Sequence, residues 1–156
     1  MATELYLEDL NVGQRFTSGS HAVTVEAIKS FARQFDPQPF HLDEAAAVQS
    51  FFQGLAASGW HTAAITMKLL VESGMRLSGG LIGAGGELTW PRPTRPGDVL
   101  TVISEVMALT PSRSRPERGF VTVKCETQNQ RGEAVQVMTS RMLVWRRPAQ
   151  GAISAN

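Results

Sequence analysis

Asp36 and His41, five residues apart in the segment DPQPFHLDE, are the side chains best suited to proton transfer in this chain. Pro37 and Pro39 fix two backbone φ angles, so the segment loses little entropy when it presents the acid and the imidazole together. Aspartate supplies a base, which works near neutral pH only where burial raises its pKa, and a histidine of pKa ~6.5 can be tuned in either direction. The pair predicts an enzyme that moves protons. The residues alone leave a structural alternative open, in which Asp36 caps a turn and His41 caps the next helix.

The segment GLAASGWHT offers a second chemical feature, the start of a long helix at Ser58 or Gly59. The first N–H groups of a helix have no partner within it, and with the helix dipole they favour negative charge such as that of an enolate oxygen. Glycine also lets a ligand approach the backbone closely. The segment predicts a site for a developing anion, whereas the alternative is an ordinary helix start that binds only a cap or water.

Helices are predicted in the first half of the chain, over residues 24–35, 43–52 and 58–73. Thr24 is placed to cap the first helix, which ends before Pro37. Its apolar residues recur at helical spacing and predict one buried face, made by Ile28, Phe31, Ala32 and Phe35. The third helix is apolar on most of its circumference, which predicts an interior helix that ends at Gly74 in a left-handed cap.

Strands are predicted in the second half, where the apolar pattern changes to a period of two. The clearest case is GFVTVKCETQN, and VLTVISEVMAL and AVQVMTSRMLVW are strand-like by their β-branched content, with ELTWPRP as a shorter strand. Helices followed by strands predict an α+β domain, with an antiparallel β-sheet wrapped around a long central α-helix. We expect residues 1–147 to form this single domain and 148–156 to form a small, polar C-terminal tail.

The composition excludes several classes of protein. The 156 residues are 42% hydrophobic, with 15 Lys and Arg against 14 Asp and Glu, which argues against a general nucleic-acid binder. Cys125 is the only cysteine, and His21, His41 and His61 lack the short spacing of metal ligands, so neither a disulfide nor a metal site is expected. MATELYLEDL is not a secretory signal, and no apolar segment reaches the ~20 residues of a membrane span. We therefore expect a cytoplasmic protein with no membrane partner.

Three separated segments resemble those of a known family in type and order. FARQFDPQPFHLDEAAA, GLAASGWHT and GGELTWPRPTRPGDVL are similar to segments of the MaoC-like dehydratases, which include the (R)-specific enoyl-CoA hydratases. In the hydratase motif of that family a histidine follows an aspartate by five residues, and Asp36 and His41 match both. The departures are Phe35, Gln38 and Phe40. The family's small polar residue about two turns into the central helix falls near Met67.

The resemblance, which covers residues 8–146, implies a hotdog fold and at least a homodimer with substrate at the subunit interface. It implies reversible syn addition of water to a trans-2-enoyl thioester, carried by coenzyme A or by an acyl carrier, with no other cofactor. Asp36 is then the base toward water, His41 positions that water, and the N–H of Gly59 polarises the thioester carbonyl.

Further residues are predicted to bind substrate. Ser58 begins the central helix beside Gly59, and Phe40, Trp60, Met67 and Trp90 are large enough to narrow a pocket toward short or branched acyl groups. Arg92 and Arg95 suit the phosphates of coenzyme A, because a guanidinium binds phosphate through two parallel hydrogen bonds. The cluster Arg113, Arg115 and Arg118 is an alternative for that role, and a solvated loop is another.

Two rival functions remain open from the sequence. A hotdog acyl-CoA thioesterase would release free thiol from a saturated thioester instead of consuming an enoyl double bond. A non-catalytic acyl-thioester-binding subunit would keep the shape without the chemistry. Acyl chain length is also left open.

Overall fold

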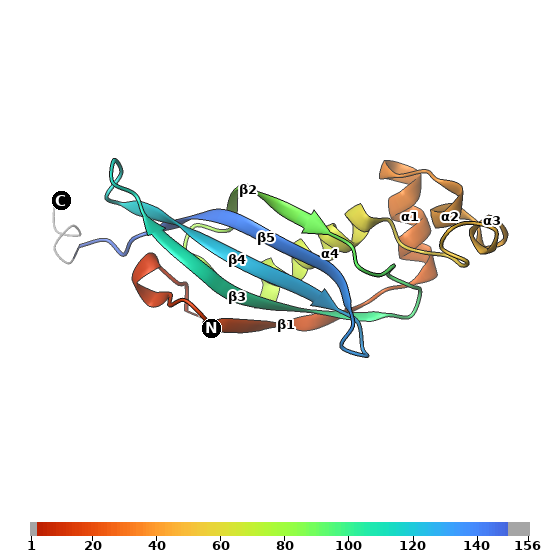
Figure 1. Ribbon diagram of the computed structural model, residues 1–156, viewed down its shortest axis with the longest axis horizontal. Helices are drawn as coiled ribbons and strands as arrows, with labels where there is room; N and C mark the ends of the chain where they lie inside the picture. Colours follow the sequence, from red (N-terminus) through yellow and green to blue (C-terminus); the bar gives the residue numbers. More distant parts are fainter. Residues whose placement is uncertain (1–2, 150–156) are drawn as a thin grey trace, which may run out of the picture.

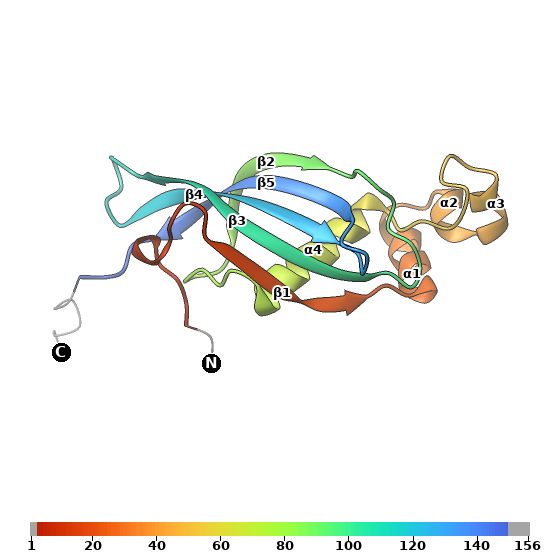
Figure 2. The ribbon, with the colours of Figure 1, turned by 60° about the horizontal axis from the view of Figure 1, so that its bottom comes forward.

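A curved antiparallel sheet of five strands forms the body of the protein, which the computed structural model describes over residues 3–149 (Figure 1). The strands pair in the order β1-β3-β4-β5-β2, and every neighbouring pair is antiparallel. They are β1 (Arg15–Ala22), β2 (Ile82–Thr89), β3 (Val99–Pro111), β4 (Arg118–Gln128) and β5 (Ala134–Trp145). The long helix α4 (Gly59–Ser73) runs along one face of the sheet, as Figure 2 shows. The predicted α+β class is confirmed.

Three shorter helices gather at one end of the sheet, beside the N-terminal end of α4 (Figure 1). They are α1 (Val25–Phe35), α2 (Pro39–Leu42) and α3 (Glu44–Val48), and a single 3₁₀ turn, η1, covers Leu7–Asp9. Thr24 caps α1 as predicted, since its hydroxyl accepts a hydrogen bond of 3.1 Å from the Ala27 N–H. None of the helices described within residues 3–149 is long and apolar enough to cross a membrane.

The predicted helix over 43–52 is too long, and α2 is missing from the prediction. Only α3 is helical within that range. Pro39 occupies the first turn of α2, where its fixed φ favours helix and its missing N–H costs nothing. The chain therefore forms two short helices, where the sequence predicted a loop followed by one longer helix.

Strand β1 interrupts the predicted helical half of the chain. Its sequence, RFTSGSHA, has no apolar alternation, so its pattern gave no strand signal. Tertiary pairing with β3 stabilises it, and the buried Ser18 hydroxyl accepts a hydrogen bond of 2.9 Å from the Val102 N–H where the pairing register shifts. Pairing with a strand more than 80 residues later in the chain thus makes this segment a strand.

Strand β2 begins earlier than the predicted ELTWPRP segment and runs through a glycine-rich stretch. A Cβ atom on Gly86 would lie 2.4 Å from the carbonyl oxygen of Thr139 on β5. Glycine is therefore needed there for the two strands to pair. The same glycines give no apolar alternation, so the sequence predicted a strand only from Glu87 on.

Helix α4 buries one side only. The buried residues are His61, Thr62, Ile65, Thr66, Leu69 and Leu70. On the other side Trp60, Met67 and Val71 are 61%, 45% and 55% exposed, so the prediction of an interior helix is wrong for the single chain. The left-handed cap is also wrong, because Gly74 has a φ of −89°.

The core lies between α4 and the inner face of the sheet. Val121, Val123 and Cys125 on β4 are buried, which confirms the period-two prediction for that strand. On α1, Ile28 and Ala32 are buried as predicted, whereas Phe35, the last residue of the helix, is 69% exposed. Phe35 extends past the elements that cover the rest of its face.

Candidate active site

Asp36 and His41 lie side by side where α1 ends and α2 begins. Asp36 is the C-cap of α1, and its backbone N–H bonds to the Ala32 carbonyl at 2.9 Å. His41 lies on α2, which starts two residues after Pro37. This turn places the Oδ2 atom of Asp36 3.3 Å from the Nε2 atom of His41. The predicted acid and imidazole therefore form a pair, with side chains 16% and 4% exposed.

The tautomer of His41 follows from its second nitrogen. Nδ1 lies 2.6 Å from the carbonyl oxygen of Ala56, which can only accept a hydrogen bond. Nδ1 therefore carries a proton, and in the neutral ring the lone pair of Nε2 points toward Asp36. The phenyl ring of Phe40 meets the imidazole edge-on at 4.6 Å and helps to hold it.

Asp36 is held in its ionised form by two more side chains. The hydroxyl of Ser58 donates to Oδ2 and the amide of Gln38 donates to Oδ1, both at 2.6 Å. Burial alone would raise the pKa of the Asp36 carboxyl, but these hydrogen bonds, together with His41, outweigh it and lower the pKa. The expectation of a base whose pKa is raised by burial is therefore wrong for the ligand-free protein.

Ser58 has a different role from the predicted one. Its side chain is fully buried, donates to Asp36 and accepts a hydrogen bond of 3.2 Å from the Trp60 N–H. Ser58 thus caps α4 and ties the start of that helix to the Asp36 carboxylate. These contacts differ from the predicted contact of Ser58 with substrate, which stays a prediction.

Gly59 is the first residue of α4, as one of the two predicted starts had it. The Ser58 carbonyl accepts from the N–H groups of His61 and Thr62, and within residues 3–149 no acceptor is recorded for the N–H of Gly59. A Cβ atom at Gly59 would lie 2.6 to 2.8 Å from ring atoms of Trp90. Glycine is required here because the indole of Trp90 lies directly against its Cα.

Trp90 is anchored by a chain of buried polar groups. Its indole N–H donates to Gln136 Oε1 at 3.0 Å, and Gln136 Nε2 donates to the Thr66 hydroxyl at 3.2 Å. Gln136 and Thr66 are fully buried. Trp60 meets the same indole edge-on, with 5.3 Å between the ring centres. The wall beside Gly59 is therefore the Trp90 indole, which is anchored by Gln136 on β5 and, through Gln136, by Thr66 on the buried side of α4.

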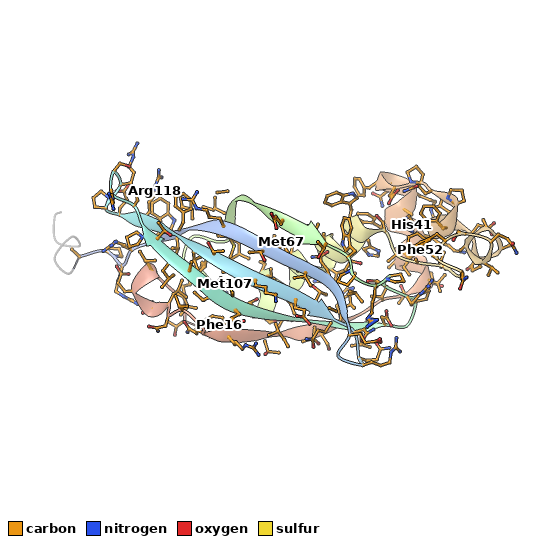
Figure 3. All side chains as sticks on the ribbon, viewed as in Figure 1. Phe16, His41, Phe52, Met67, Met107 and Arg118 are labelled. Carbon is orange, nitrogen blue, oxygen red and sulfur yellow. The ribbon has the colours of Figure 1, made fainter. Side chains whose placement is uncertain are left out.

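Asp36, His41, Gly59 and Trp90 line one cavity of about 560 Å³. Among its lining residues are Asp36, Gln38, Phe40, His41, Phe51, Phe52, Gly59, Trp60, Thr62, Trp90, Arg92 and Thr94. Phe40, Trp60 and Trp90 are thus brought together as expected, whereas Met67 lines a separate groove and lies along α4, away from His41 (Figure 3). Sequence reasoning missed Phe51 and Phe52, whose only signal was an aromatic pair after an alanine-rich helix.

The predicted phosphate-binding arginines divide into three cases. Arg92 lines the cavity, half exposed, with its Nε 3.5 Å from a carboxylate oxygen of Glu133. The guanidinium of Arg95 instead donates to backbone carbonyls of the loop before α4, which differs from its predicted role. Arg118, which belongs to the alternative cluster, lies at the opposite end of the molecule from His41 (Figure 3).

Comparison with known proteins agrees with this geometry. Residues 11–138 match the family model described as the FAS1-like dehydratase domain region. The crystal structure of a MaoC-like dehydratase from Rhodospirillum rubrum is 63% identical, with a TM-score of 0.92, and the match covers 93% of this chain and 99% of that one. The chain belongs to the MaoC-like dehydratase family. Its sheet and central helix are the hotdog fold, as the sequence resemblance implied.

Two further relatives extend the comparison. Uncharacterized protein YdeM of Bacillus subtilis is 40% identical over 128 residues, which cover 80% of this chain and 88% of that protein. The 3-hydroxybutyryl-CoA dehydratase of Methylorubrum extorquens is 34% identical over 117 residues, which cover 71% of this chain and 69% of that protein. Family membership supports a hydratase or dehydratase activity in general.

Proposed function

We propose that this protein adds water reversibly and syn across the double bond of a trans-2-enoyl thioester, and removes it from the matching (R)-3-hydroxyacyl thioester. The observation that carries this proposal is the Asp36–His41 pair, 3.3 Å apart on a cavity that also reaches the start of α4. The relative named as a 3-hydroxybutyryl-CoA dehydratase supports it. The four-carbon crotonyl thioester is therefore the first substrate to test.

Water is activated between the two side chains. With Nδ1–H directed at Ala56, neutral His41 offers only the Nε2 lone pair, and ionised Asp36 offers Oδ2 beside it. A water molecule donates one hydrogen to each, which leaves its own lone pair free to attack C3. The apolar acyl group then covers Asp36 and removes it further from solvent, which raises its pKa and strengthens it as the base.

The proton taken from water returns to the substrate at C2. Attack at C3 moves the double-bond electrons toward the thioester oxygen, and the N–H of Gly59 with the dipole of α4 stabilises the enolate charge. The protonated pair then delivers the proton to C2 on the same face, so Asp36 and His41 end in their starting state. Dehydration is the same path in reverse.

Aromatic residues and Arg92 provide the binding surface. Phe40, Trp60 and Trp90 line the cavity and bound the space for an acyl group, which favours short or branched chains. Arg92 lies on the same cavity and is exposed enough to meet a phosphate of coenzyme A. A phosphopantetheine on an acyl carrier presents the thioester through the same chemistry.

A second copy of the chain completes the unit in this proposal. Within residues 3–149, strand β2 lies at the edge of the sheet and pairs with β5 alone. Trp60, Met67, Val71 and Ile82 expose apolar surface on α4 and β2. An edge strand beside an exposed apolar face is a surface that a partner covers, so we expect a homodimer. Light scattering that gives one chain mass at micromolar concentration would contradict this part.

The test of the reaction is loss of enoyl absorbance from crotonyl-CoA, with chiral analysis of the product. Asp36→Asn keeps the shape but removes the base, and we expect the rate to fall about 1,000-fold. The matched control is Asp43→Asn, which keeps a capping side chain on α3 and should retain the rate. Near-normal hydration by Asp36→Asn contradicts the proposal. Release of free thiol from butyryl-CoA would favour a thioesterase instead. Tight binding of enoyl thioesters without turnover would favour a non-catalytic subunit.

A further inference from the structure

The guanidinium of Arg95 holds the loop that precedes α4. Nη2 donates to the Phe52 carbonyl at 2.5 Å, and Nη1 donates to the carbonyls of Gly54 and Leu55 at 2.9 and 3.3 Å. Arg95 is half-buried, and among residues 3–149 no carboxylate lies within ion-pair distance of it. Its charge-assisted hydrogen bonds therefore act on backbone oxygens alone.

The loop needs such support because its backbone is irregular. Gln53 has a φ of +54° and Gly54 a φ of +159°, so no helix or strand ladder satisfies the carbonyls around them. Arg95 is itself fixed on the β2–β3 connection, where its N–H donates to Asp98 Oδ2 at 2.8 Å. Gln130 donates to the other oxygen of Asp98 at 3.1 Å. A rigid turn thus presents the guanidinium to the loop.

The loop carries the atom that orients His41. Ala56, the residue after Leu55, supplies the carbonyl that accepts the Nδ1–H of His41 at 2.6 Å. Phe52, whose carbonyl Arg95 also holds, packs its ring 6.0 Å from the imidazole (Figure 3). These two neighbours of the imidazole therefore depend on the stretch that Arg95 fixes.

We infer that Arg95 is a positioning residue, which sets the tautomer and direction of His41 by holding residues 52–55. The catalytic consequence rests on the proposed hydratase function, but the effect on the imidazole does not. The inference replaces direct phosphate binding, the role that the sequence predicted for Arg95. The two roles predict different kinetic effects of an Arg95 substitution on a substrate that lacks phosphates.

The kinetic test compares crotonyl-CoA with crotonyl-N-acetylcysteamine, which has the thioester but no phosphate. For Arg95→Met we expect kcat to fall about 100-fold with both substrates, because a small misplacement of a catalytic group has that cost. Arg95→Lys keeps the charge but loses the forked set of guanidinium donors, and we expect kcat to fall about tenfold. A rise in KM confined to crotonyl-CoA, with kcat unchanged, would show phosphate binding and overturn the inference.

The tautomer of the His41 imidazole can be measured without any enzymatic turnover. In ¹⁵N NMR of the labelled protein, His41 should show a protonated Nδ1 in the wild type and a mixture of tautomers in Arg95→Met. The control is Arg15→Met, which removes an exposed arginine whose guanidinium lies 3.6 Å from a carboxylate oxygen of Glu105. An unchanged His41 spectrum in a folded Arg95 variant overturns the inference, and Arg95→Lys decides if Arg95→Met does not fold. If the wild type hydrates no enoyl thioester, the proposed function fails and the spectra still test the inference.

Discussion

Two buried histidines near the start of α4 have opposite surroundings. His41 has one nitrogen on the Ala56 carbonyl and the other facing the Asp36 carboxylate. His61, only 8% exposed, stacks on Phe31 with ring centres 4.8 Å apart, and its Nδ1 has no hydrogen-bond partner among residues 3–149. Burial lowers the pKa of His61, and the nearby His21 lowers it further, so the ring stays neutral. In the proposed function His41 exchanges protons because a carbonyl orients its ring and a carboxylate faces it, and His61 lacks both of these partners among the described residues.

The largest expected effect comes from removing the imidazole that has both partners. His41→Gln should lower kcat by about 10²- to 10⁴-fold, the usual contribution of a general acid–base group. Asp36 also loses a neighbour that lowers its pKa, so the acid limb of the residual rate should move to higher pH. Crotonyl-CoA hydration between pH 5 and 9 measures both. A rate within tenfold of the wild type would remove the distinction between His41 and His61.

Gly59→Ala should give the next largest effect. The new Cβ would lie 2.6 Å from the Trp90 ring, so the indole or the start of α4 has to move. We expect a loss of about 1–3 kcal/mol in the free energy of unfolding, as for other overpacked sites. We also expect kcat to fall by about 10²- to 10³-fold if the Gly59 N–H polarises the carbonyl.

The matched control for that substitution is Gly19→Ala on β1. A Cβ there would meet only Ser73 Oγ, at an ordinary 3.4 Å. Urea unfolding and crotonyl-CoA hydration should both stay near wild type. If Gly59→Ala behaved like this control, the wall formed by Trp90 would have no part in catalysis.

Ser58→Ala tests how the carboxylate is held, with a smaller effect. The variant loses the N-cap of α4 and the donor to Asp36, and its free energy of unfolding should fall by about 1 kcal/mol. Because the lowered pKa of Asp36 stabilises the fold above its ordinary titration range, that stability is lost as pH falls through the native pKa. In Ser58→Ala the native pKa of Asp36 is higher, so this loss should be smaller and should be complete at a higher pH.

The kinetic readout of Ser58→Ala is the acid limb of the pH–rate profile, which should also move to higher pH. Ser30→Ala, at an exposed position on α1, serves as the control and should leave the limb in place. An unshifted limb in Ser58→Ala would show that Ser58 does not set the protonation of Asp36.

His61→Leu should have the smallest effect. It removes an unpartnered buried nitrogen, so the free energy of unfolding at pH 7 should change by less than about 1 kcal/mol and kcat should stay near wild type. The pKa of His61 is lower in the fold than in the unfolded chain, so wild-type stability should fall as pH drops below ~6.5. In His61→Leu that part of the pH dependence should be absent. An unchanged pH dependence would assign it to other groups.

The sequence predicted the features that neighbouring residues control. The start of α1 at Thr24, the start of α4 after Ser58 and the alternation on β4 depend on caps and periodicity within a few residues. The Asp36–His41 spacing also lies within one short segment, so the pair was visible before the fold was known. These predictions were confirmed because their causes are local.

Only the tertiary structure decided the rest, because the deciding contacts join residues far apart in the chain. Strand β1 exists through pairing with β3, and Gly59 is required by Trp90, which lies 31 residues later. Arg95 looked like a phosphate ligand by its type and instead reaches carbonyls 40 to 43 residues earlier. Residue type limits which hydrogen bonds a side chain can make, but the packing of distant segments selects the one it makes.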